Sequence, residues 1–127
     1  ARPEPERNSA GAIAAAARQV AHTIGAQAIA TFTSTGSTTL RMARERPDCP
    51  IVGLTASEAS ARRLAVVWGV HPVVAPEPNS MSEMVTRALR VAQAEGFAKS
   101  GEEVVVTAGV PFGVPGTTNA LRVASVK

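Results

Sequence analysis

The sequence contains little cysteine and few aromatic residues. Its 127 residues include one Cys, one Trp, three Phe and no Tyr. The single cysteine, Cys49, excludes an internal disulfide, a CxxC redox pair and a cysteine-rich zinc cluster. It lies between Asp48 and Pro50 in a predicted loop, where an inert small residue is a better interpretation than a reactive thiol. This cysteine usage favours a cytoplasmic protein.

The positive charge is modest and dispersed. Lys and Arg number 13 against 10 Asp and Glu, which gives a net charge of +3, and the longest basic run is Arg62-Arg63. Few rings are available to stack on bases, so we expect no nucleic-acid partner. No apolar run approaches the roughly 20 residues of a membrane span, so we expect no membrane partner either.

Common catalytic signatures are also missing. The sequence has no GxxxxGK phosphate loop, no GxGxxG fingerprint, no HExxH and no GxSxG. His22 falls in a predicted helix and His71 precedes Pro72, positions that favour structural or solvated histidines over a general base. We therefore predict no catalytic residue and no metal site in this chain.

Helix and strand patterns alternate along the rest of the sequence. The predicted helices are 9–24 with Ser9 as N-cap, 40–46, a third that begins at Ser57 and carries the stripe Ala61, Leu64, Ala65 and Trp68, and a fourth that begins at the capping box of Ser80 and Glu83 and ends at Gly96. The predicted strands are 28–33, 51–55, 72–75, 104–108 and 120–126.

The connections between these elements predict the fold. Strands joined by helices should be parallel, whereas the loop 109–119 is too short for a crossover helix, so the last strand should be antiparallel to its neighbour. We predict a three-layer α/β/α sandwich over residues 9–127, preceded by a linker at 1–8. The polar, proline-containing opening suggests a piece of a longer protein.

Two loops are candidates for ligand binding, because ligands of open α/β sheets bind beyond the carboxyl ends of the strands. The first consists of Thr33, Ser34, Thr35, Gly36, Ser37 and Thr38. It follows a strand, opens a helix and carries a glycine among hydroxyl groups, a combination that favours binding of a phosphate or carboxylate. A purely structural turn would need Gly36 but not so many hydroxyls.

The second candidate is the Gly- and Pro-rich loop 109–119, which includes Gly113, Gly116 and Thr117. A tight connection into an edge strand explains it equally well. If the first and fourth strands are adjacent, both loops meet at one switch point, and that coincidence strengthens the ligand hypothesis.

Four segments together resemble the C-terminal domain of pyruvate kinase. They are the alanine-rich helix at 13–18, Phe32-Thr33-Ser34-Thr35-Gly36-Ser37-Thr38, 65–72 and Gly113-Val114-Pro115-Gly116-Thr117-Thr118-Asn119. The resemblance covers nearly the whole chain in the same order. It implies a five-stranded sheet in the order 3-2-1-4-5 with the last strand antiparallel.

The resemblance also implies a function. The domain would be the allosteric and oligomerisation module of an enzyme that transfers phosphate from phosphoenolpyruvate to ADP with magnesium or manganese and potassium. The catalytic barrel is absent from this sequence, so the isolated chain should be inactive and need no cofactor. The loop matching 33–38 would hold a phosphorylated effector, the loop matching 110–117 would close over it, and the last strand would pair across a two-fold axis in a homotetramer.

The sequence departs from the effector-binding pattern at three positions. Ser34 and Ser37 stand where relatives that respond to sugar bisphosphates often carry Lys and Arg, and Met84 aligns with a further Arg. A monophosphate such as a sugar phosphate or AMP is therefore at least as plausible as fructose 1,6-bisphosphate. Two alternatives remain open, namely a free-standing relative that binds a small ligand and an interaction module without any ligand.

Overall fold

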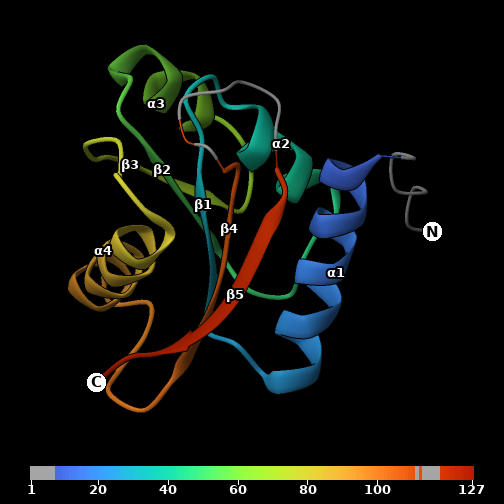
Figure 1. Ribbon diagram of the computed structural model, residues 1–127, viewed down its shortest axis with the longest axis vertical. Coiled ribbons are helices and arrows are strands. Elements are labelled where there is room, and N and C mark those ends of the chain that lie inside the picture. Colours follow the sequence, from blue (N-terminus) through green and yellow to red (C-terminus); the bar gives the residue numbers. More distant parts are fainter. Residues whose placement is uncertain (1–7, 111, 113–117) are drawn as a thin grey trace.

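The computed structural model describes residues 8–110, 112 and 118–127, so the predicted linker lies outside it except for Asn8. The chain folds around one five-stranded sheet with the order β3-β2-β1-β4-β5 (Figure 1). The strands are β1 (Ala28–Phe32), β2 (Ile51–Thr55), β3 (Val70–Val74), β4 (Glu103–Ala108) and β5 (Ala120–Ser125). The helices are α1 (Ser9–Ile24), α2 (Ser37–Arg44), α3 (Glu58–Leu64) and α4 (Met81–Ala94).

Strand directions follow from the connections, as predicted. The central strand β1 is parallel to both neighbours, with Ile29 opposite Ile51 of β2 and Val105 of β4. The last strand runs antiparallel to β4, with Arg122 opposite Val106. The sheet order and the antiparallel last strand are thus confirmed.

Helices cover both faces of the sheet, and α1 and α4 lie on opposite sides of it (Figure 1). On one face, α4 packs its buried residues Met84, Ala88 and Ala92 against alternate side chains of β1, β2 and β4. On the other face, small residues of α1 and Met42 of α2 pack around Ile29. Strands buried on both sides need continuous apolar runs, which explains the sequences of β1, β2 and β4.

Two helix starts differ from the sequence-based expectation. Asn8, not Ser9, caps α1, because its Oδ1 accepts a hydrogen bond of 2.8 Å from the amide of Gly11. The second helix begins at Ser37 instead of Leu40 and ends at Arg44. Gly36 initiates it with φ = 100°, a backbone conformation that glycine adopts without strain.

The predicted apolar stripe of the third helix is wrong at its end. The helix stops at Leu64, which is buried, and the chain then turns to start β3 at Val70. Trp68 lies in that turn and is 91% exposed, so it is not a core residue. A helical period that continues past the last turn of a helix produces this kind of error.

The two edge strands of the sheet, β3 and β5, contain residues that are typical of an edge position. Pro72 lies in β3, which is an edge strand. Proline has no N–H to donate, and an edge strand tolerates it because no strand pairs with its open side. At the other edge, Arg122 and Val123 of β5 are exposed. Among the described residues, no helix is long and apolar enough to cross a bilayer.

Candidate functional site

The hydroxyl-rich turn 33–38 lies between the carboxyl end of β1 and the start of α2, as the sequence predicted. Its own side chains shape it. The amide of Gly36 donates a hydrogen bond of 2.7 Å to Thr33 Oγ1, and the amide of Ser37 makes a longer contact of 3.4 Å with Thr35 Oγ1. Two of the main-chain donors expected to face a ligand are therefore engaged by hydroxyls of the turn.

The next two amides are not engaged in this way. Leu40 is the first residue of α2 to donate to a main-chain carbonyl, that of Gly36, at 2.9 Å. Within the described part of the chain, the amides of Thr38 and Thr39 donate no hydrogen bond, and both residues are at least nine-tenths buried. Buried main-chain donors normally find a partner, so these two amides are the candidate donors for an anion at this turn.

Threonine side chains lie between the start of α2 and the sheet. Thr31 Oγ1 of β1 lies 2.7 Å from Thr39 Oγ1. Thr107 is the register partner of Thr31 on β4, and its buried Oγ1 has no hydrogen-bond partner among the described residues. Gly53 of β2 leaves room for this contact, because a Cβ there would lie 3.0 Å from Thr39 Cγ2. The start of α2 therefore packs closely against the sheet.

The two loops singled out in the sequence meet in the structure. Thr38 Oγ1 lies 2.9 Å from Thr118 Oγ1, and both residues are buried. The ends of the second loop are also tied together, since the side chain of Asn119 bonds both the amide and the carbonyl of Val110, at 2.9 and 2.7 Å. Phe112 packs edge-on against Phe32, with ring centroids 6.0 Å apart. Gly113, Gly116 and Thr117 lie outside the described residues.

A third element, α3, contacts the turn, and the sequence did not point to it. Ser60 Oγ donates a hydrogen bond of 3.1 Å to the carbonyl of Ser34. Arg63 Nη2 lies 3.0 Å from Ser60 Oγ and 3.4 Å from the carbonyl oxygen of Thr35. The spacing of three residues that places Ser60 and Arg63 on one face of α3 was the available signal. The strand order then brings that face to the turn.

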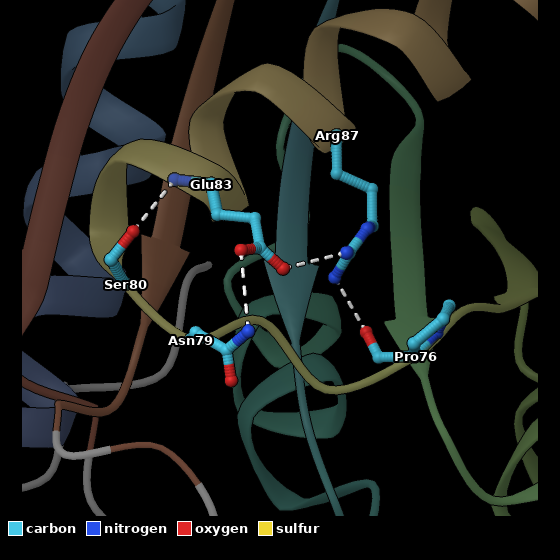
Figure 2. Close-up of polar contacts among 5 residues, drawn as sticks. All are labelled: Pro76, Asn79, Ser80, Glu83 and Arg87. Carbon is cyan, nitrogen blue, oxygen red and sulfur yellow. Dashed lines mark hydrogen bonds and ion pairs between the residues drawn. The ribbon is translucent and has the colours of Figure 1, made fainter.

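Met84 does not face the turn as an effector-binding side chain would. It is fully buried in the core between α4 and the sheet. The nearby loop between β3 and α4 is held by other residues, shown in Figure 2. Arg87 donates to the carbonyl of Pro76 at 2.6 Å and to Glu83 Oε1 at 2.8 Å. The charge of Arg87 is therefore paired within α4.

A cavity of about 230 Å³ lies near the amino end of β2, beside Cys49 and the exposed ring of Trp68. Burial raises the pKa of the Cys49 thiol above its ordinary value. A main-chain hydrogen bond lowers this pKa by a smaller amount, and the Asp48 carboxylate adds the smallest effect, a further rise. The thiol is therefore protonated at neutral pH, as expected of an inert residue.

Both histidines pair with carboxylates at the surface. His22 Nδ1 contacts Asp48 Oδ2, and His71 Nε2 lies 2.6 Å from Glu95 Oε1. Across the described ranges, no group of three or more His, Cys, Asp or Glu side chains is placed to hold a metal ion.

Comparison with known proteins gives consistent matches. The family model for the pyruvate kinase alpha/beta domain matches residues 11–124. The pyruvate kinase of Methylorubrum extorquens is 45% identical over 125 residues, which are 98% of this chain and 26% of that protein. The pyruvate kinase of Lactobacillus delbrueckii subsp. bulgaricus is 42% identical, over 91% of this chain and 20% of that protein. That of Geobacillus stearothermophilus is 44% identical over 84% of this chain. The chain spans about a quarter or less of the curated relatives it matches.

Proposed function

The chain belongs to the pyruvate kinase family, as its alpha/beta domain, and from this premise we propose that it is a regulatory module that binds a phosphorylated small molecule at the turn 33–38. The observation that carries the proposal is the start of α2. There, the buried amides of Thr38 and Thr39 donate no hydrogen bond within the described part of the chain. Gly36 supplies no side-chain cap that would compete for them.

The chemistry of this helix start favours an anion. The amides of the first turn carry the partial positive charge of the helix dipole, which attracts a phosphoryl group. The hydroxyls of Ser34, Thr35 and Ser37 line the exposed side of the same turn and can donate further hydrogen bonds. Gly113, Gly116 and Thr117 of the second loop complete the proposed site. A sugar phosphate or AMP fits this set of neutral donors.

In the proposed assembly this domain is one part of an enzyme that transfers phosphate from phosphoenolpyruvate to ADP in the cytoplasm. Magnesium or manganese and potassium would serve the catalytic part, and the domain itself would need no cofactor. None of its residues is assigned a catalytic role, so the chain alone should be inactive. Effector binding at the turn would act on the catalytic part through the rest of the chain.

Self-association through β5 is the second component of the proposal. This strand forms one edge of the sheet, and Arg122 and Val123 on it are exposed. An open edge strand can pair with the same strand of a second copy across a two-fold axis. Such pairing would place two effector sites in one assembly.

A ligand panel tests the effector site. Ribose 5-phosphate, glucose 6-phosphate, AMP and fructose 1,6-bisphosphate are titrated separately by calorimetry, and the melting temperature is followed in parallel. A ligand present at 100 times its dissociation constant stabilises a single site by about 2.7 kcal/mol. For a domain of this size that corresponds to a rise of roughly 10 °C. Absence of heat and of any shift with all four compounds would reject the proposal.

A further inference from the structure

Resting on the effector site proposed above, we infer that Arg63 of α3 supplies the cationic contact to the bound phosphoryl group, in place of the charges that the turn itself lacks. The turn and α3 are already connected. Arg63 Nη2 lies 3.4 Å from the carbonyl oxygen of Thr35, and Ser60 Oγ bonds the carbonyl of Ser34 at 3.1 Å. The guanidinium group is therefore held at the rim of the turn.

A cation would strengthen phosphate binding at this site, because the groups of the turn are neutral. None of the six residues from 33 to 38 is charged, and two of the amides are engaged by Thr33 and Thr35. A phosphoryl dianion that exchanges water for neutral donors alone loses much of its hydration energy. An arginine compensates best, because its planar set of donors matches phosphate oxygens in pairs.

The bonds that Arg63 makes leave it able to take this role. Both of its hydrogen bonds in the described part of the chain are made by Nη2, so Nη1 and Nε remain as donors. The contact with the Thr35 carbonyl is long and lies at an exposed position. A charge-assisted hydrogen bond to a phosphate oxygen is roughly twice as strong as a bond to a neutral acceptor. Arg63 should therefore give up its contact with the Thr35 carbonyl in favour of a bound phosphate.

Neighbouring arginines are placed less well. Arg87 is paired with Glu83 and with the carbonyl of Pro76 (Figure 2). Arg62 is exposed, precedes Arg63 on α3 and has no contact with the turn among the described residues. One cation and one helix start suit one dianionic phosphoryl group. The inferred ligand class is therefore a phosphate monoester with a single phosphoryl group.

The test compares Arg63→Gln with the matched control Arg62→Gln, which removes the same charge from the adjacent position. Inorganic phosphate and ribose 5-phosphate are titrated by calorimetry at low and at moderate salt. We expect Arg63→Gln to weaken both about tenfold and to reduce the salt dependence of binding, because a direct ionic contact is lost. Arg63→Lys should restore part of the affinity, and Arg62→Gln should stay within about twofold of the unaltered protein.

Other outcomes overturn the inference. If both Gln variants bind alike, Arg63 is not the cationic contact, although the turn remains the binding site. If Arg63→Gln weakens binding with an unchanged salt dependence, and Ser60→Ala weakens it equally, Arg63 acts only by holding the turn. If the unaltered protein binds neither probe, the effector site proposed above fails and this inference fails with it.

Discussion

The hydroxyl groups of Thr38 and Thr118 lie 2.9 Å apart and join segments separated by eighty residues. Thr38 belongs to the first turn of α2, and Thr118 lies two residues before β5, in the loop that leads into that strand. Both side chains are buried, so neither hydroxyl can exchange this partner freely for water. This contact links the two loops of the proposed effector site.

Thr118→Val should destabilise the domain by about 1–3 kcal/mol, because the hydroxyl of Thr38 loses its buried partner. The double variant with Thr38→Val removes both polar groups and should recover part of that loss. Urea unfolding of the two single variants and the double variant measures the coupling between them. Strictly additive effects would show that the two hydroxyls do not interact in solution.

Gly36→Asp should abolish binding of phosphate esters. The substitution adds a negative charge where the anion would sit, and φ = 100° strains any residue with a Cβ. The nearest atom to such a Cβ, Leu64 Cδ2, is 3.8 Å away, so the stability cost of about 1–2 kcal/mol comes from the backbone. Calorimetry with ribose 5-phosphate measures the loss.

The matched control for this variant is Gly25→Asp. Gly25 also has a positive φ, of 66°, and a Cβ there would meet nothing within 4 Å. Gly25 is the C-cap of α1, and the segment that follows it leads into β1. Equal affinity of both variants for the ester would place the binding site elsewhere.

The features that could be predicted from the sequence are those that depend on interactions between residues close together in the chain. Local signals were sufficient for the five strands and for the caps Ser57 and Ser80, because both caps bond an amide three residues later. The hydroxyl-rich turn was found because its residues are contiguous. Arg63 was not, since its contact with Thr35 depends on which strands are neighbours.

The error at Trp68 has a related cause. Its spacing from Leu64 fits a helix, but the distance from the end of α3 to the first residue of β3 must be covered by turns. Val67 and Val70 make those turns by bonding the carbonyls of Leu64 and Val67, respectively. Apolar periodicity carries no information on where the following strand must begin.

Ser80→Ala should destabilise the domain by about 1 kcal/mol, because Ser80 Oγ accepts a hydrogen bond of 3.1 Å from the amide of Glu83 at the start of α4. The side chain of Glu83 does not return to Ser80. It pairs with Arg87 instead, so that contact should survive the substitution (Figure 2). Ser82→Ala, at an exposed position two residues further along, is the control and should change the free energy of unfolding little. Equal unfolding midpoints in urea for both variants would contradict the capping role.

Alkylation of Cys49 should be slower in the folded protein than in the unfolded chain at pH 7.5. Burial, and to a lesser extent the Asp48 carboxylate, raises the pKa of the thiol, so a smaller fraction is thiolate when the protein is folded. The rate with iodoacetamide, followed by mass spectrometry, should rise with pH and reach its midpoint above that of the same chain in guanidinium chloride. The folded state also holds this proton more tightly, so the free energy of unfolding should fall as pH rises above about 8.5, the ordinary value for cysteine. Cys49→Ser should remove that part of the pH dependence, and a folded protein that reacts as fast as the unfolded one at pH 7.5 would contradict the raised pKa.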